Sequence, residues 1–309
     1  MQSRYKSASE FYNNIFEQRV QKISIDAGFT CPNRDGKKGR GGCTYCNNDT
    51  FKPFYCSPKK SVTQQLQEGI AFFSKKYKSQ KYLAYFQAFT NTYAPLQTLK
   101  NLYNEALRVE GVIGLVFATR PDCVDEQILD YLAELSKSYF VLIEFGVESL
   151  NDNVLERVNR KSTFADAKKA LEMTAERNIY TGVHLIMGLP GESRQQMLES
   201  ATEISKLNFT LLKLHQLQIV KNTLMAKDYE KNHDDYELFE LEEYIEFVVD
   251  YLEMLSPDIY VERFTSEVPA DMLIAPKWGR VKNFEIVHKI EKKLKERNTF
   301  QGAKIIDNL

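Results

Sequence analysis

The chain has 309 residues, of which 43% are hydrophobic and 27% are charged, with 41 Lys and Arg against 42 Asp and Glu. These values exclude a disordered, collagen-like or coiled-coil chain and indicate an ordinary globular protein. The net charge of −1 excludes a strongly basic protein, although a neutral total can still hide a basic face. No stretch approaches the roughly 20 apolar residues of a membrane span, and the N-terminus has no apolar signal core. We therefore expect a cytoplasmic protein without a membrane partner.

Apolar, β-rich segments alternate with amphipathic helical segments along most of the chain. The expected strands cover residues 22–26, 82–89, 113–119, 140–147, 182–188 and 211–219, and the expected helices cover residues 62–77, 96–109, 126–135, 163–177 and 194–207. Ser162 or Thr163 can cap the fourth of these helices. Several strands are nearly continuous in Val, Ile, Leu and Phe, as expected of parallel strands covered on both faces. Six βα units with short connections predict a partial (β/α)6 TIM-like barrel, with catalytic groups where strands end and loops begin.

The pattern changes after about residue 222. A long helix is expected over residues 238–255, a shorter and mixed segment over 260–274, and a basic amphipathic helix over 288–297. We predict an N-terminal extension (1–20), the barrel (21–225), and a mostly helical C-terminal extension with a basic tail (226–309). No repeat or Gly/Ser-rich linker separates independent domains.

Three cysteines lie in one glycine-rich loop directly after the first expected strand. Cys31, Cys43 and Cys46 form the pattern C-x11-C-x2-C, and the odd total of five cysteines favours thiols or metal ligands over a disulfide framework. A structural zinc site would need a fourth ligand, for which Cys56 is a candidate. A [4Fe–4S] cluster held by three thiolates leaves one iron open to a substrate. The spacing favours the cluster, with the zinc site as the alternative.

The loop resembles the cluster-binding loop of radical S-adenosylmethionine (SAM) enzymes, in which an aromatic residue precedes the third cysteine, as Tyr45 does here. The spacing differs from the commoner C-x3-C-x2-C. CPNRDG and GGCTYCNN, with QAFTNTYAP, TRPDC, EFGVES, VNRKST and HLIMGLPGE in the same order as the strands, resemble the YhcC/YtqA-like, MnmL-type subgroup. This subgroup is related to the radical SAM domain of the Elongator catalytic subunit. The resemblance covers roughly residues 20–225 and implies a [4Fe–4S] cluster on Cys31, Cys43 and Cys46, with SAM as the second cofactor.

Two glutamates fall on one face of the segment EFGVES. Strand alternation puts Glu144 and Glu148 on the inner face of the barrel, where two carboxylates are costly without partners. Because the resemblance implies that this strand contributes to SAM binding, we assign Glu144 to the ribose hydroxyls and Glu148 to the same site. An internal ion pair to Arg120 or Lys213 is the alternative, above all for Glu148.

Further SAM contacts are implied at the ends of other strands. Thr90, Asn91 and Thr92 stand where many radical SAM enzymes carry a glycine-rich segment that holds the SAM amino group, and their oxygens can accept hydrogen bonds from an ammonium. Arg160 can bind the SAM carboxylate bidentately. Gly188 can permit close approach of the adenine or a sharp turn. A plain turn at 90–92 and a solvated loop arginine are the competing interpretations.

Four inward-facing polar residues suit an anionic substrate and are the candidate catalytic residues: Arg120, His184, Lys213 and His215. The resemblance implies an enzyme in which the reduced cluster cleaves SAM to methionine and a 5′-deoxyadenosyl radical, which abstracts hydrogen from the substrate. An electron donor such as flavodoxin or ferredoxin is then required. A single histidine in a strand is more often a hydrogen-bonded core residue than a catalyst.

The resemblance to MnmL-type members implies a tRNA substrate, a wobble uridine whose 5-carboxymethylaminomethyl group is converted to 5-aminomethyl. Basic residues near the N-terminus, around residues 75–81 and in the tail 289–297 are consistent with RNA binding, although each can equally be a solvated face. One alternative is a radical SAM enzyme acting on a small anionic or porphyrin-type substrate. Another is a non-catalytic, zinc-stabilised RNA-binding protein.

Overall fold

A computed structural model describes residues 3–75, 77, 80–279 and 281–306 of the chain. Lys76 and Lys78, part of the expected basic segment around residues 75–81, lie outside the described residues. Among the helices of the described part, none is long and apolar enough to cross a membrane.

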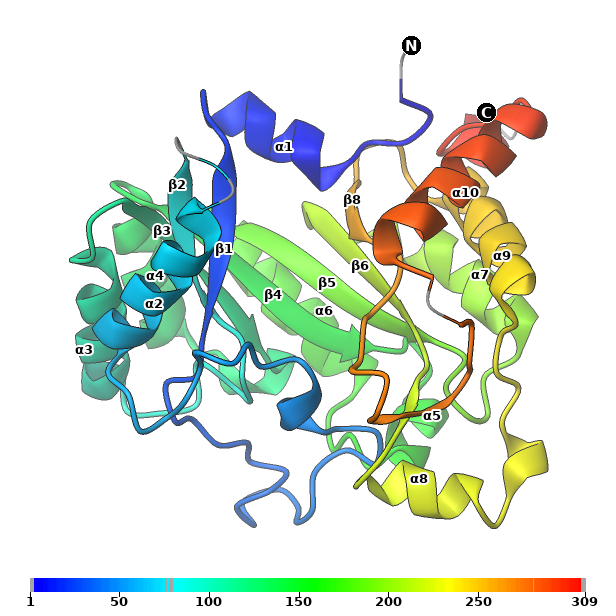
Figure 1. Cartoon of the computed structure of the whole chain (residues 1–309), viewed down its shortest axis with the longest axis horizontal. Coiled ribbons are helices and arrows are strands. Elements are labelled where there is room, and N and C mark those ends of the chain that lie inside the picture. Colours follow the sequence, from blue (N-terminus) through cyan, green and yellow to red (C-terminus); the bar gives the residue numbers. More distant parts are fainter. Residues whose placement is uncertain (1–2, 76, 78–79, 280, 307–309) are drawn as a thin grey trace.

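Seven strands form one parallel sheet that curls into a half-barrel, in the order β1-β2-β3-β4-β5-β6-β8 (Figure 1). Their bounds are Val20–Ile25 (β1), Lys81–Phe86 (β2), Val112–Thr119 (β3), Phe140–Glu148 (β4), Tyr180–Met187 (β5), Leu211–Gln216 (β6) and Tyr260–Arg263 (β8). The six expected strands and the partial TIM-like barrel are therefore confirmed, but the expected strand 82–89 ends at Phe86 and the expected strand 211–219 ends at Gln216. The seventh strand, β8, was not expected as a strand and comes from the mixed segment 260–274. A separate antiparallel pair consists of β7 (Ile219–Val220) and β9 (Leu273–Ala275).

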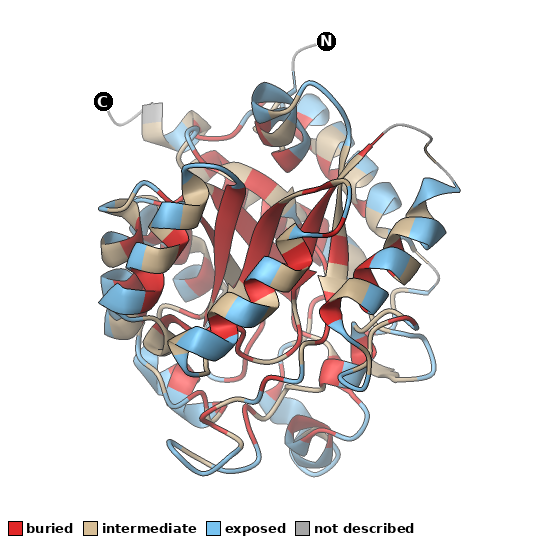
Figure 2. Ribbon diagram, turned by 90° about the vertical axis from the view of Figure 1, so that its left-hand side faces the viewer, coloured by how far each residue is buried: buried red, intermediate tan, exposed pale blue. Residues whose placement is uncertain are grey.

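Helices cover the outer face of the sheet and extend beyond β6. Their bounds are Ala8–Ile15 (α1), Val62–Ser74 (α2), Leu96–Leu107 (α3), Glu126–Ser136 (α4), Asp152–Arg157 (α5), Phe164–Ala175 (α6), Arg194–Ile204 (α7), Leu224–Tyr229 (α8), Leu241–Met254 (α9), Asn283–Glu296 (α10) and Ala303–Ile306 (α11). Thr163 caps α6, as expected, in a capping box with Asp166. Figure 2 shows buried strands behind helices whose outer surfaces are exposed. The part of the chain after residue 226 contains α9, α10 and α11 together with the two short strands β8 and β9.

Apolar side chains pack on the outer face of the sheet and at one end of the half-barrel. On the outer face, side chains such as Leu115 and Ile143 are completely buried beneath helices, which stabilises the fold by roughly 1.5–3 kcal/mol for each such side chain. At the amino-terminal ends of the strands, Phe11 of α1 packs edge-on against Tyr180 at 5.2 Å and contacts Tyr260 at 5.4 Å between ring centroids. Helix α1 therefore fills that end, and the polar interior lies toward the carboxyl-terminal ends.

Candidate functional site

A cavity of about 680 Å³ lies inside the half-barrel, toward the carboxyl-terminal ends of the strands. Its volume is in the range of small-molecule and cofactor sites. The expected site residues that line it are Cys31, Cys43, Tyr45, Cys46, Thr90, Arg120, Glu144, Glu148, Arg160, His184, Lys213 and His215. Asn91, Thr92 and Gly188 are not among its lining residues. The fold thus brings most of the expected residues to one site.

The cysteine loop is a series of tight turns between β1 and α2. The Arg34 N–H donates to the Cys31 carbonyl at 2.8 Å, and the Cys46 N–H donates to the Cys43 carbonyl at 3.1 Å. Gly42 has φ +84°, and a Cβ at this position would lie 2.8 Å from Nε of Arg34. A glycine is therefore required next to Cys43 for both its backbone angle and its close approach to the arginine.

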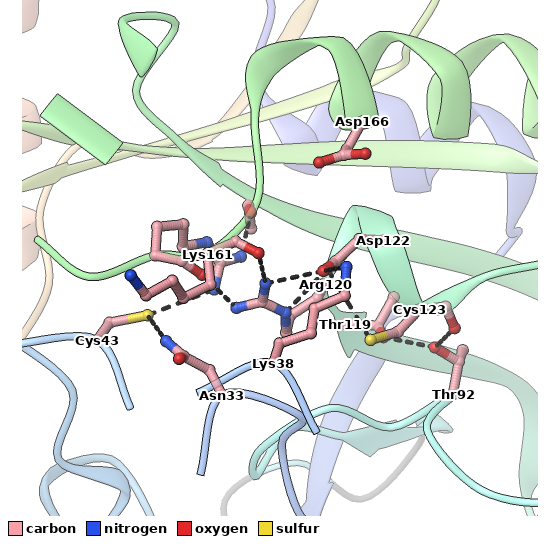
Figure 3. Close-up of polar contacts among 12 residues, drawn as sticks. Asn33, Lys38, Cys43, Thr92, Thr119, Arg120, Asp122, Cys123, Lys161 and Asp166 are labelled. Atoms are coloured by element: carbon pink, nitrogen blue, oxygen red, sulfur yellow. Dashed lines mark hydrogen bonds and ion pairs between the residues drawn. The ribbon is translucent and has the colours of Figure 1, made fainter. Parts of the chain in front are cut away.

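Nitrogen donors face the sulfur atoms of this loop. Nη1 of Arg160 lies 3.7 Å from Sγ of Cys43, and Nδ2 of Asn48 lies 3.6 Å from Sγ of Cys46. Nδ2 of Asn33 is a second donor toward Sγ of Cys43, at 3.8 Å (Figure 3). Hydrogen bonds to sulfur stabilise the negative charge of thiolate ligands and tune iron–sulfur clusters. The donor set therefore fits a cluster held by Cys31, Cys43 and Cys46.

The spacing of the donors is also relevant to the zinc alternative. Among the described residues, no three Cys, His, Asp or Glu side chains are grouped closely enough to hold one metal ion. A cluster needs no such group, because each thiolate binds a different iron. The sulfur of Cys56 approaches the Ser24 carbonyl at 3.0 Å, and burial raises the pKa of this thiol to about 12. Cys56 does not line the cavity, so the structure does not support it as the fourth ligand.

Arg120 connects two loops through its hydrogen bonds and its ion pair with Asp122. Its Nε and Nη2 bind the carboxylate of Asp122 at 2.8 and 2.9 Å, and its Nη1 donates to the Arg160 carbonyl at 2.8 Å. Nη2 also donates to the Lys161 carbonyl at 3.1 Å, so four of its five N–H groups are used. Lys38 of the cysteine loop binds the same Asp122 at 2.5 Å (Figure 3). Arg120 thus holds the 160–161 loop and the cysteine loop in place.

Arg160 lies between the cysteine loop and the end of β4. Its Nη2 donates to the Gly146 carbonyl at 2.5 Å and lies 3.8 Å from Oε1 of Glu148. Burial would lower its pKa, but Tyr45, Cys43 and Glu148 more than offset this and raise the pKa well above its usual value. Nε of Arg160 and the hydroxyl of Tyr45 are buried without a hydrogen-bond partner in the described part of the chain. Unpaired buried groups of this kind fit a bound polar ligand.

The segment 90–92 is buried at the end of β2. The hydroxyl of Thr92 lies 2.6 Å from both the Thr119 hydroxyl and the Cys123 carbonyl, and Nδ2 of Asn91 donates to the Ala118 carbonyl at 2.7 Å. These two side chains therefore fasten the segment to β3 and to the residues that follow it. Only Thr90 of the three lines the cavity.

Four charged side chains from four strands form a largely buried cluster inside the half-barrel, here called the floor cluster: Lys22 (β1), Glu144 (β4), Lys213 (β6) and Glu262 (β8). Lys22 binds Glu144 at 2.7 Å and Glu262 at 2.6 Å, and Lys213 binds Glu144 at 2.6 Å. Because β1 and β8 are the two edge strands, the floor cluster joins both edges of the sheet. The four formal charges cancel.

The pKa of Glu144 reflects these partners. Burial alone would raise it, but Lys213 and Lys22, with a hydrogen bond from His184, more than offset burial and lower the pKa well below its usual value. Burial lowers the pKa of Lys213, and the two glutamates only partly offset the effect. Oε2 of Glu144 also accepts a hydrogen bond from Tyr85 at 2.7 Å. Glu148, with one ion pair at 3.8 Å, has the freer carboxylate of the two on this strand.

The two histidines lie side by side on β5 and β6, with ring centroids 5.5 Å apart. Nε2 of His184 lies 3.1 Å from Oε2 of Glu144. Burial lowers the pKa of His215 well below 6.5, and His184 and Arg263 lower it further, so His215 is neutral at pH 7. Gly188 has φ +94° and its N–H approaches Sδ of Met197 at 2.9 Å. Of the two expected roles for this glycine, the structure thus shows the turn after β5.

Several site residues were not expected from the sequence. Asp122 follows the arginine it binds within TRPDC, so that motif held a usable signal. Lys22 stands at an inward position of β1, but a lone strand lysine carries no signal without knowledge of its partners. Glu262 and Arg263 belong to a four-residue strand in the segment expected to be mixed. Their assignment needs the sheet pairing, which the sequence pattern did not reveal.

The basic C-terminal tail packs as α10 against an acidic face of α9. Lys289 binds Glu242 at 2.7 Å, Lys293 binds Glu246 at 2.6 Å, and Arg297 also contacts α9. Exposed ion pairs of this kind contribute only about 0–1 kcal/mol each, but they neutralise part of the tail. The tail is therefore a weaker candidate for RNA binding than its sequence suggested.

Two family models match the chain. The model described as the Radical SAM superfamily matches residues 31–204, and the Radical_SAM C-terminal domain matches residues 209–296. Protein YtqA of Bacillus subtilis (strain 168) is 34% identical over 301 residues, which cover 97% of this chain and 92% of YtqA. The resemblance to the YhcC/YtqA-like group is therefore confirmed.

More distant similarity extends to proteins of archaea. The tRNA uridine(34) acetyltransferase of Methanocaldococcus jannaschii is 22% identical over 166 residues, which cover 52% of this chain and 30% of that protein. The structure of Methanocaldococcus infernus Elp3 with an N-terminal deletion superimposes with a TM-score of 0.69 at 14% identity, covering 92% of this chain and 64% of that chain. The fold is thus that of the radical SAM half-barrel. Because the superfamily model spans more than half of the chain and YtqA matches nearly all of it, the chain belongs to the radical SAM superfamily.

Proposed function

We propose that this protein modifies tRNA, converting the 5-carboxymethylaminomethyl group of a wobble uridine to 5-aminomethyl. The observation that carries the proposal is one cavity that joins the three-cysteine loop to a charged barrel interior. Similarity to a tRNA uridine(34) acetyltransferase supports a wobble uridine as the target. An electron donor such as flavodoxin or ferredoxin belongs to the same proposal.

Members of the radical SAM superfamily use a [4Fe–4S] cluster and SAM, which when bound supply a radical able to abstract hydrogen. In this chain, Cys31, Cys43 and Cys46 would hold the cluster, and the donors of Asn33, Asn48 and Arg160 would stabilise its sulfur ligands.

SAM would be oriented by groups that the protein leaves unpaired. The buried Nε of Arg160 would bind its carboxylate, and the buried hydroxyl of Tyr45 is a second available donor. Glu148 is the favoured acceptor for the ribose hydroxyls, because Glu144 already has four partners. Thr90 remains the candidate near the amino group, since Asn91 and Thr92 are bound to the protein itself.

An exposed aromatic surface borders the cavity. Phe51 lines the cavity and is 40% exposed, and nearby Phe54 and Phe72 are 79% and 48% exposed and pack edge-on at 5.5 Å. Bases splayed out of a single-stranded loop stack on such side chains, and each stacked base contributes about 1–3 kcal/mol to the binding free energy. This surface would contact nucleotides that flank the extruded uridine.

We expect the double substitution Phe54→Ala and Phe72→Ala to weaken tRNA binding by about tenfold or more, because two stacking surfaces are lost. Filter binding of an anticodon stem-loop measures the change. Phe300→Ala is the matched control, because Phe300 is 45% exposed and does not line the cavity. Equal binding by the double variant and the control would contradict this surface.

The proposed reaction is tested by mass spectrometry of digested tRNA from cells with and without the gene. Cells without it are expected to accumulate 5-carboxymethylaminomethyl-type uridine at the expense of 5-aminomethyl-derived forms. Identical wobble nucleosides, in an organism with no second route, would contradict the tRNA substrate. A small anionic or porphyrin-type substrate would then be the next candidate, with the cofactor chemistry unchanged.

A further inference from the structure

The cavity has a side that the cysteine loop does not form. It is built by β6, by β8 and by the segment that follows β8, with lining residues that include Lys213, His215, Glu262, Arg263 and Thr265. The register of β6 and β8 shifts between Leu212 and Lys213, so that one residue of β8 is extra. A bulge of this kind re-aims side chains. It allows the consecutive residues Glu262 and Arg263 both to reach the cavity.

Most cations that line the cavity are already paired. Lys22 and Lys213 are neutralised within the floor cluster, Arg120 is bound to Asp122, and Arg160 lies near Glu148. Arg34, the remaining loop cation, donates to the Cys46 carbonyl. Each of these side chains therefore already bonds to, or lies close to, a polar group of the protein.

Arg263 differs from all of them. It is exposed, it lines the cavity, and within the described part of the chain its side chain has no hydrogen bond or ion pair. Its register partner is Lys213, and its charge acts on neighbouring His215, which is neutral. Glu267, an exposed acidic residue of this segment that also lines the cavity, accepts a hydrogen bond from the Asn283 N–H.

The charges around Arg263 leave its guanidinium unpaired. The floor cluster sums to zero, His215 is neutral, and the carboxylate of Glu267, which also lines the cavity, accepts from the Asn283 N–H and forms no ion pair with Arg263 in the described part of the chain. A guanidinium with all its donors free matches a carboxylate or phosphate in a bidentate geometry. Such a group in a partly enclosed site attracts an anion more strongly than it would in bulk water.

We propose that Arg263 is the receptor for the carboxylate of the substrate, and that β8 thereby determines specificity for the carboxymethylaminomethyl group. The inference rests on the proposed function and deepens it. It assigns the carboxylate to Arg263 rather than to Arg120 or Lys213, two of the candidate catalytic residues, because both are already bound to acidic side chains of the protein. It also gives the C-terminal segment, through the bulge at Glu262, a direct part in substrate recognition.

The test compares two tRNAs that differ only in the presence of the 5-carboxymethylaminomethyl group. Their dissociation constants are measured with the cofactor-loaded protein, its Arg263→Gln and Arg263→Lys variants, and Arg108→Gln as the control. Arg108 is an exposed arginine that does not line this cavity. We expect Arg263→Gln to reduce the preference for the modified tRNA about tenfold, and Arg263→Lys to reduce it less, because lysine keeps the charge but loses the bidentate contact. Arg108→Gln should keep the full preference.

The other outcomes separate the inference from the function on which it rests. Equal weakening of both tRNAs by Arg263→Gln would assign the residue to a phosphate and overturn the carboxylate assignment. If Arg263→Gln kept the full preference for the modified tRNA, the carboxylate assignment would also be overturned. If this variant bound SAM more weakly but bound both tRNAs normally, Arg263 would be reassigned to that cofactor. If the unsubstituted protein itself showed no preference, the proposed substrate would be wrong and the inference would fall with it.

Discussion

Alanine at Cys31, Cys43 or Cys46 is expected to abolish SAM cleavage and to reduce the iron and sulfide content of the anaerobically reconstituted protein. The reason is that each of the three thiolates would hold a different iron, so that removal of one leaves an iron without its protein ligand. The same chain offers matched controls. Cys56→Ala and Cys123→Ala should retain iron and cleavage, because neither residue lines the cavity and burial raises the pKa of both thiols to about 12.

Two measurements decide this prediction together. Metal analysis distinguishes iron from zinc, and SAM cleavage in the absence of tRNA reports the cofactor chemistry separately from the substrate. Loss of metal in Cys56→Ala, with zinc as the metal, would contradict the three-cysteine cluster. Retained cleavage in Cys43→Ala would do the same, because Cys43 is the sulfur that both Arg160 and Asn33 approach.

The barrel could be predicted from the sequence because its strands obey simple rules. Parallel strands buried on both faces appear as apolar runs, and β3 and β4 begin or end within one residue of their expected limits. β8 could not be predicted in the same way. It has four residues, YVER, and two of them are charged, because they face the cavity or its surroundings rather than the core.

In the candidate site, the direction of a side chain could be predicted from the sequence, but its partners could not. Alternation along β4 and β6 correctly put Glu144 and Lys213 inside the barrel, because direction within a strand is a local property. What each residue binds is not local. The partners of Glu144 come from β1, β2, β5 and β6, and Arg120 is occupied by Asp122 and by carbonyls of residues 160 and 161. A sequence pattern that predicts an inward cation therefore does not predict a free one.

Lys213 illustrates the consequence for experiments. From its position alone, Lys213→Ala would be expected to impair substrate conversion. In the structure, Lys213 contacts the buried carboxylate of Glu144 and the partly buried carboxylate of Glu262, so its removal leaves both with Lys22 as their shared lysine. Reduced activity of this variant would then report a disturbed fold as well as any lost substrate contact.

We expect Lys213→Met to lower the free energy of unfolding by about 3 kcal/mol, because breaking a buried ion pair on one side leaves an uncompensated charge. Urea denaturation of the reconstituted protein measures this. The double variant Lys213→Met, Glu262→Gln removes one charge of each sign and leaves the Lys22–Glu144 pair, at 2.7 Å, intact. It should therefore lose less stability than the sum of the two single variants. Additive losses would show that the floor cluster is not a coupled unit.

The acid dependence of stability gives an independent check on the same cluster. The pKa of Glu144 is lowered in the folded state, since Lys213 and Lys22 outweigh its burial. Its contribution to stability is thus fully present above the unfolded-state pKa of about 4.3 and is lost as the pH falls through the lower, folded-state value. Lys213→Met removes one of these cations, which raises the folded-state pKa of Glu144 toward or above the unfolded value. The variant should consequently lose less stability than the unsubstituted protein between pH 6 and roughly pH 3. If the free energy of unfolding fell equally with decreasing pH in the two proteins, the assignment of Lys213 as a partner of Glu144 would be contradicted.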